Sequence, residues 1–341
     1  MMKNLKTMKI GIMGFGRIGR DFFKLAQKNP KIDITAVVDL GKPEILNYLL
    51  NSDGIENPVH LEGNYLVSGN SQTRIVHAIQ PSHVPWDAFE VDIVVDATHK
   101  YCSASQMQGH LDSGANRVII SALPRDEIDR IVVNGVNDHT ISVDDKLISA
   151  GSSTTNALAI MLKIISENFP LEYAMMTTVH AYTSDQPLQD TVGRSFRRSR
   201  SAAENIIPNT TPSPTCIEYI LPEFKDKVEG IALNVPVPKG SCLDLTLIFK
   251  ESSVTVEDVN NIMDRSAIDD PNLVGVTDDP IVSCDAIGNT KSLIFDKKAT
   301  MKSSKNMIKV LCWYDNGLGH AQQIMDTVMA YYLLDQKGSK A

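Results

Sequence analysis

The sequence predicts an α/β protein with a doubly wound Rossmann dinucleotide-binding domain and an α+β domain that contains an antiparallel or mixed sheet. Three observations predict this fold. The first half alternates strand-like and helix-like segments, the second half contains longer strand-like runs, and a GxGxxG turn follows the first strand. A chain of 341 residues is long for one core and natural for two domains.

The composition is that of a soluble globular protein, with 43% hydrophobic and 22% charged residues. The net charge of -8, from 33 basic and 41 acidic residues, argues against nucleic acid or an acidic membrane as a partner. The longest apolar runs, such as 93–95, are too short to span a bilayer, and residues 1–6 do not lead into a secretion signal.

Cysteine usage indicates a reducing compartment, so we expect a cytoplasmic protein without a bound metal. The cysteines are odd in number and never two residues apart, which predicts neither a disulfide framework nor a zinc site. Most are expected to be small buried side chains. They are Cys102, Cys216, Cys242, Cys284 and Cys312.

The first half reads as strand, glycine turn, helix and strand. Met8–Met13 predicts a strand, apolar residues at helical spacing over 21–28 predict a helix, and Ile32–Val38 predicts a strand that ends at Asp39. The pattern then continues as in a largely parallel sheet. The further elements expected are helices at 43–50, 103–113 and 156–168 and strands at 92–97, 117–121, 131–136 and 146–149.

The second half predicts an antiparallel sheet packed against helices. Strands are expected at 173–182, 228–237, 242–250 and 306–314, and helices at 256–266 and 320–334. The polar stretch 186–215 predicts a long ordered loop. We expect an NAD-binding domain at 1–152, to which a C-terminal helix at 317–341 returns, and a catalytic domain at 153–316.

The glycine turn has the context of a dinucleotide site. Gly14 permits the tight turn, Gly16 lets the backbone approach a pyrophosphate, and Gly19 permits close packing of the helix. Asp39, at the end of the second strand, would accept hydrogen bonds from ribose hydroxyls. Its carboxylate repels a 2'-phosphate, so the site favours NAD over NADP.

Several further stretches occur in the order of one family and span nearly the whole chain. They are 14–20, 118–122, 135–137, 152–156 (Ser-Ser-Thr-Thr-Asn), 177–183 (Thr-Thr-Val-His-Ala-Tyr-Thr), 205–208 and 313–316 (Trp-Tyr-Asp-Asn). The series resembles glyceraldehyde-3-phosphate dehydrogenase. The resemblance implies the fold, NAD as cofactor, and a homotetramer in which 186–215 reaches toward a neighbour's cofactor.

The resemblance also implies residue roles. In the family a cysteine thiolate attacks an aldehyde, a histidine takes the proton, hydride passes to NAD, and inorganic phosphate cleaves the thioester. Ser153 matches the nucleophile, His180 the base, and Asn316 the residue that holds the nicotinamide amide. The other cofactor positions are Gly14, Phe15, Gly16, Arg17, Ile18, Gly19, Asp39, Thr98 and Ser121. The substrate and anion positions are Ser152, Thr154, Thr183, Arg198, Thr211 and Asn234.

Ser153 is the largest departure, because the family carries Ser-Cys-Thr-Thr-Asn at 152–156. A serine hydroxyl has a pKa several units above the value of about 8.5 for a thiol. Hydrolases activate such a serine with a histidine, but they add a carboxylate and an oxyanion hole. Asp185 lies near His180 in sequence. Two explanations stay open: the serine is natural, in a diverged or inactive member, or it is an engineered replacement of cysteine.

Other departures favour divergence, and a single engineered change explains none of them. Asn234 stands where the family has an arginine that grips the substrate phosphate, and an amide lacks that charge and fork of donors. Pro212 removes an amide donor beside Thr211. Gly317 and His320 stand where the family has glutamate and tyrosine.

Two features have two interpretations each. The basic run 194–200, which contains Arg197, Arg198 and Arg200, either binds an anion or forms intersubunit salt bridges. His99 replaces a glycine of the family's Ser-Thr-Gly, and it is either a substrate contact or a packed or solvent-facing ring.

The sequence therefore supports three hypotheses. The first is an NAD-dependent aldehyde dehydrogenase or acyl reductase of this family, diverged in substrate. The second is an NAD-binding scaffold without turnover. The third, which has least support, is a hydrolase that uses Ser153 and His180.

Overall fold

The computed structural model describes residues 7–193, 195–303 and 305–338. Two compact units contain these residues. The first comprises 7–132, 138–151 and 321–338, and the second comprises Val133–Asn137 and Ser152–His320. The expected boundaries, after 152 and 316, lie within a few residues of these limits, apart from the short segment 133–137.

The first unit contains a nine-stranded sheet in the order β3-β4-β5-β2-β1-β6-β7-β9-β8. The pairs β3–β4 and β4–β5 are antiparallel and all others are parallel. The central strands are buried along their length, as parallel strands covered on both faces must be. The strands are β1 Met8–Met13, β2 Ile32–Val38, β3 His60–Glu62, β4 Tyr65–Ser68, β5 Ser71–Val76, β6 Ile93–Asp96, β7 Arg117–Ile120, β8 Arg130–Ile131 and β9 Leu147–Ser149.

The sheet reverses its order between β1 and β6. From β1 the chain winds outward through β2 and β5, and from β6 it winds the other way through β7. Dinucleotides bind at the carboxyl ends of strands at such a switch point. The carboxyl ends concerned are Met13 of β1 and Asp96 of β6, which are neighbours in the strand register.

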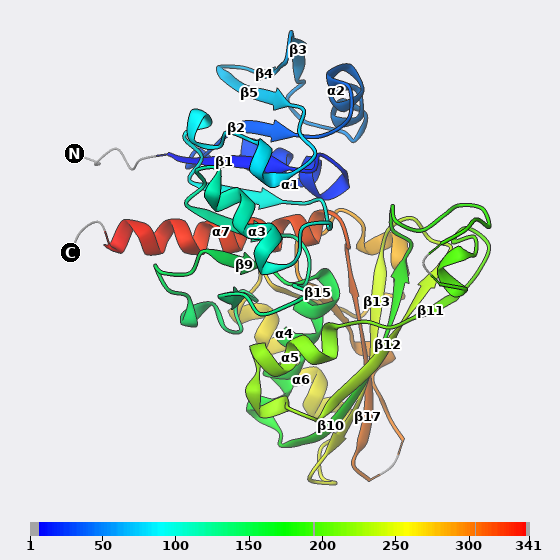
Figure 1. Cartoon of the computed structure of the whole chain (residues 1–341). Helices are drawn as coiled ribbons and strands as arrows, with labels where there is room; N and C mark the ends of the chain where they lie inside the picture. Colours follow the sequence, from blue (N-terminus) through cyan, green and yellow to red (C-terminus); the bar gives the residue numbers. More distant parts are fainter. Residues whose placement is uncertain (1–6, 194, 304, 339–341) are drawn as a thin grey trace. The chain divides into compact units, whose positions relative to one another are not determined.

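Helices cover this sheet and share its core. Phe22 and Phe23 of α1 and Ile324 and Val328 of α7 are buried together with apolar residues of β1, β2 and β6. Figure 1 shows α7, in red, running beside the sheet. The helices of this unit are α1 Arg17–Gln27, α2 Pro43–Ser52, α3 Ala104–Asp112 and α7 Leu318–Gly338, whose first residues belong to the second unit.

The second unit contains an eight-stranded mixed sheet. Its main order is β11-β12-β10-β13-β17-β15-β14, and β16 pairs with β17. The pairs β10–β12 and β14–β15 are parallel, and the others are antiparallel. The strands are β10 Leu171–Ala181, β11 Ile207–Asn209, β12 Val228–Val235, β13 Ser241–Phe249, β14 Val274–Thr277, β15 Leu293–Asp296, β16 Met301–Lys302 and β17 Met307–Tyr314.

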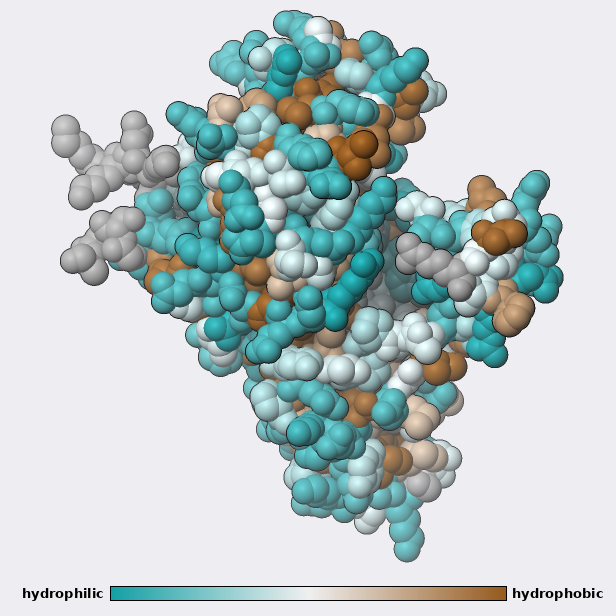
Figure 2. Space-filling view, viewed as in Figure 1, coloured by the Kyte–Doolittle hydropathy of each residue, from teal (hydrophilic) through white to brown (hydrophobic). Residues whose placement is uncertain are grey.

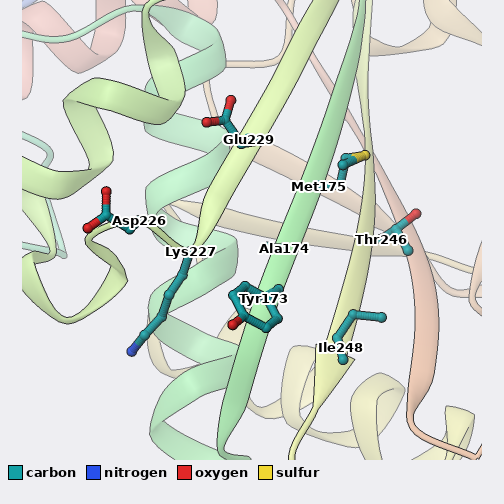
Figure 3. Close-up of a pocket in the computed structure, with 8 residues that line it drawn as sticks. All are labelled: Tyr173, Ala174, Met175, Asp226, Lys227, Glu229, Thr246 and Ile248. Carbon is teal, nitrogen blue, oxygen red and sulfur yellow. The ribbon is translucent and has the colours of Figure 1, made fainter.

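Helices α4 Ser153–Asn168, α5 Ser213–Ile220 and α6 Val256–Asp269 lie on one side of this sheet (Figure 1). The side chains of β10 alternate accordingly, with Ala174, Met176 and Thr178 buried. On the opposite face Tyr173 and Met175 are exposed. Register places Tyr173 beside Ile248 and Met175 beside Thr246, and these side chains border a cavity of ≈ 360 Å³ (Figure 3).

Two sequence predictions need correction. A strand was expected at 131–136, but β8 ends at Ile131, because Gly135 adopts φ +76° and the side chain of Asn137 accepts a hydrogen bond from the amide of Val133. The stretch 186–215 is not loop throughout: it contains a 3₁₀ turn at Arg197–Ser199, strand β11 and the start of α5. Arg194, in the basic run, lies outside the described residues.

Among the described residues, the helices are too short or too polar to cross a bilayer. Figure 2 shows a face dominated by hydrophilic residues, with hydrophobic ones in small groups.

Candidate functional site

The glycine turn has the geometry that a dinucleotide site requires. Gly14 has φ +90°, a conformation that favours glycine. A Cβ on Gly19 would lie 2.1 Å from the carbonyl oxygen of Gly14, so only glycine permits this approach of α1. A Cβ on Gly16 would meet no atom of the described residues within 4 Å, so packing among them does not require a glycine at this position.

Asp39 stabilises this turn from the end of β2. Its Oδ2 accepts a hydrogen bond of 2.7 Å from the amide of Phe15, and its Oδ1 accepts one of 2.8 Å from the amide of Gly41. The expected contact with ribose hydroxyls stays a prediction. The structure shows a role of Asp39 that the sequence did not reveal: its carboxylate fixes the backbone of the glycine turn.

The other expected cofactor residues of the first unit lie around the same carboxyl ends. Phe15 is buried and packs edge-on against Phe23. Arg17 and Ile18 begin α1. Thr98 and Ser121 follow β6 and β7, and both donate their amides to Asp96, Thr98 to the carboxylate and Ser121 to the backbone oxygen.

In the second unit, Ser153 is the first residue of the 16-residue helix α4 and is 7% exposed. The helix begins three residues earlier than expected, because Ser152 caps it by accepting a hydrogen bond of 3.1 Å from the amide of Thr155. The positive end of the helix dipole therefore lies at Ser153, where it favours negative charge.

Tyr314 links the helix that carries Ser153 to the strand that carries His180. Its hydroxyl lies 2.8 Å from Oγ1 of Thr154 and 2.7 Å from Oγ1 of Thr178. Its ring lies edge-on to the imidazole, with 6.2 Å between centroids. Burial raises the pKa of Tyr314, so its hydroxyl stays protonated. Ser153 and His180 thus belong to segments that meet at Tyr314.

His180 is held in one tautomer. Its Nδ1 lies 2.6 Å from the carbonyl oxygen of Ala181, which can only accept. Nδ1 therefore carries the proton, and Nε2 of the neutral ring has the lone pair that a general base needs. Asp185 bonds to Thr183 and to Arg198.

The anion positions of α4 and α5 are joined by hydroxyl groups. Oγ of Ser152 lies 2.8 Å from Oγ1 of Thr155, which donates to Oγ of Ser213 over 3.0 Å. Thr211 donates to the same Ser213 oxygen over 3.2 Å. Thr155 and Ser213 were not among the predicted residues, and no local pattern in the sequence relates them. Pro212 lies at the N-cap of α5.

Arg198 and Asn234, two of the predicted anion-site residues, each form a hydrogen bond with another side chain. Arg198 donates to Asp185 over 3.1 Å, and the two side chains are largely exposed. The side-chain oxygen of Asn234 accepts a hydrogen bond from Asn209. Register places Asn234 beside His180, so the two side chains share one face of the sheet.

Three further positions from the sequence analysis are Asn316, His320 and His99. Oδ1 of Asn316 accepts a hydrogen bond of 3.1 Å from the amide of Gly240. His320 is buried. His99 has φ +57°, so the backbone keeps the conformation suited to glycine although a histidine stands there.

None of the buried cysteines described in the structure has a thiol that favours the thiolate form. Burial raises the pKa of Cys102, Cys216 and Cys242 to about 11, and it raises that of Cys312 as well. These thiols stay protonated near neutral pH.

Comparison with known proteins agrees with this geometry. Residues 8–104 match the family described as glyceraldehyde 3-phosphate dehydrogenase, NAD binding domain, and residues 152–316 match its C-terminal domain. Proteins named glyceraldehyde-3-phosphate dehydrogenase are similar over most of the chain. That of Borreliella burgdorferi is 41% identical over 331 residues, covering 94% of this chain and 98% of its own. That of Priestia megaterium is 39% identical over 333 residues, covering 96% and 98%. The chain therefore belongs to the glyceraldehyde-3-phosphate dehydrogenase family and has NAD as its cofactor.

Proposed function

We propose that this protein is an NAD-dependent oxidoreductase that acts on an aldehyde. Its substrate differs from glyceraldehyde 3-phosphate, because the positions that would bind a phosphate group are altered. Two observations together support this proposal. The glycine turn has the geometry of a dinucleotide site, and His180 is held in the tautomer that a general base needs. An NAD-binding scaffold without turnover would not need His180 to be held in this tautomer.

In the proposed reaction the Ser153 hydroxyl adds to the aldehyde carbon while Nε2 of His180 takes the hydroxyl proton. The N-terminus of α4 stabilises the negative charge that develops on the carbonyl oxygen. NAD, when bound, would accept the hydride from the carbon of this adduct, and the adduct would thereby become an ester of Ser153. Water or inorganic phosphate would cleave that ester, with His180 again available for proton transfer.

The serine makes the first step slow. Its hydroxyl ionises several pKa units above a thiol, so a cysteine at the same position gives a far larger fraction of nucleophile. Ser153→Cys should therefore raise NADH formation from aldehydes by about 100-fold or more. Absorbance of NADH with phosphorylated and unphosphorylated aldehydes measures this. If Ser153→Cys binds NAD but makes no NADH with any aldehyde, the scaffold hypothesis replaces the enzyme hypothesis.

The altered substrate site is supported by the amide pair beside His180. Asn209 and Asn234 bond to each other, and neither carries the charge that a guanidinium would bring to a phosphate. Such a pair suits a neutral hydroxyl or amide group on the substrate. Because Asn209 and Asn234 fit each other, and a single engineered change would not produce this pair, we favour a natural serine at position 153 over an engineered one.

We also propose a cytoplasmic homotetramer. The five cysteines are all free thiols, which suits a reducing compartment. Tyr173 and Met175 are 54% and 63% exposed on the outer face of the second sheet, and the cavity of Figure 3 lies among them. Exposed apolar groups of this kind mark interfaces. Light scattering should give four chain masses, and a mass of one chain would refute the assembly.

A further inference from the structure

A buried chain of side chains holds the loop that follows β6. Asp96 is 2% exposed and lies at the switch point. Its Oδ1 accepts hydrogen bonds from the amide (2.8 Å) and the hydroxyl (2.6 Å) of Thr98, and its Oδ2 lies 3.2 Å from Nε2 of His110. Nδ1 of His110 lies 3.0 Å from Nε1 of Trp86. Both rings are fully buried.

The indole at one end of this series of hydrogen bonds determines which group donates and which accepts in each of them. The indole of Trp86 can only donate, so Nδ1 of His110 must accept. The proton of the neutral imidazole then lies on Nε2 and is donated to Asp96. The carboxylate can only accept, so the Thr98 hydroxyl donates to it. The order of donation is therefore from Trp86 to His110 to Asp96, with Thr98 donating from the other side.

The loop held in this way borders the glycine turn. A Cβ on Gly14 would lie 2.9 Å from the backbone of Ala97 and Thr98, so the two segments are in close contact. His99 follows with φ +57°, which a side chain rarely adopts without support. Trp86 cannot shift toward β1 to relax the chain, because its ring occupies the space where a Cβ of Gly11 would be.

We infer that Asp96, His110 and Trp86 are positioning residues for NAD binding, which hold Thr98 and His99 in the conformation that the dinucleotide site requires. Asp96 contacts the loop through Thr98, and His110 and Trp86 act on the loop through Asp96. This inference concerns NAD binding alone and does not depend on the reaction proposed for Ser153.

The directionality of the chain supplies a sharp test. In Asp96→Asn the amide oxygen still accepts from Thr98, but the amide nitrogen meets the Nε2 proton of His110. Moving that proton to Nδ1 would set it against the indole N–H of Trp86. One hydrogen bond is therefore lost in either tautomer of His110. Calorimetry should show NAD binding about tenfold weaker in Asp96→Asn.

Trp86→Phe should rescue that loss, although it removes a further hydrogen bond. Without the indole N–H, His110 can carry its proton on Nδ1 and accept from the amide at position 96. The double variant should therefore bind NAD within about threefold of Trp86→Phe alone. Amide hydrogen exchange at 97–100 without NAD should speed up in Asp96→Asn and slow again in the double variant.

Additive losses in the double variant would overturn the inference, because a role in packing alone predicts accumulated damage. Unchanged NAD affinity in Asp96→Asn would overturn it as well. If Asp96→Asn does not fold, His110→Phe and Trp86→Phe serve instead. His110→Phe removes the donor to the Asp96 carboxylate and should bind NAD about tenfold more weakly, whereas Trp86→Phe keeps that donor and should lose less affinity. Equal affinity of the two variants would reject the positioning role.

Discussion

The N-termini of α1 and α4 are built in opposite ways, although each helix follows a strand and a glycine-containing turn. Gly16 begins α1 without a side-chain cap, and the space beside its Cα is open. Ser152 begins α4 with a side-chain cap, and its hydroxyl is part of a network that reaches Ser213. Both ends present amide donors and a positive dipole.

The difference indicates what each helix end serves. The end of α1 leaves room for a phosphate to approach the backbone, which is how dinucleotide sites use a helix. At the end of α4 the amide of Thr155 donates to the Ser152 hydroxyl, which orders the first turn that carries Ser153. We therefore propose that the first end serves a ligand and the second a reacting side chain.

The largest effect that would test this comparison is expected at Gly16. Gly16→Ala should fold normally, because the added methyl meets no atom of the described residues and φ is -71°. The methyl would occupy the approach of the pyrophosphate, so NAD binding should weaken on the order of 100-fold. Calorimetry gives the affinity, and thermal unfolding should show Tm within about 2 °C of the unmodified protein. Undiminished NAD affinity would remove the ligand role of this helix end.

Residues near one another in the chain made the glycine turn and its flanking strands predictable, whereas β3, β4 and β5 were not predicted. The glycine spacing, the apolar strands Met8–Met13 and Ile32–Val38, and the position of Asp39 are all local signals, and the structure has these elements as expected. The turn at Gly135 ended a strand that the apolar run 131–136 had suggested, because backbone conformation and the Asn137 side chain outweighed hydropathy.

The second unit was less predictable at its site. Hydrogen bonds there join residues far apart in sequence, such as Thr154 with Tyr314 and Asn209 with Asn234. A single sequence carries no periodicity that relates such pairs. The same holds for Trp86 and His110 in the first unit, which form a hydrogen bond although 24 positions separate them in sequence.

A smaller effect is expected when charge is added beside His180. Asn234→Arg would place a guanidinium on the face of the sheet that His180 shares. In a Ser153→Cys background, the ratio of kcat/KM for a phosphorylated aldehyde to that for its unphosphorylated form should rise about tenfold. Asn234→Gln is the matched control, since it keeps the amide and should leave the ratio unchanged. A ratio that stays constant in Asn234→Arg would place substrate recognition away from Asn234.

The smallest effect concerns the cap of α4 and sharpens the contrast with α1. Ser152→Ala removes the hydrogen bond to the Thr155 amide and should lower the free energy of unfolding by about 1 kcal/mol, the usual cost of losing a serine cap. Ser152→Gly should cost less, because glycine is tolerated at this position. Urea unfolding of both variants measures this. Since the cap holds the first turn that carries Ser153, kcat should fall with stability in Ser152→Ala while NAD affinity stays unchanged. If Ser152→Ala weakened NAD binding as strongly as Gly16→Ala, the two helix ends would not have the separate functions that their structures indicate.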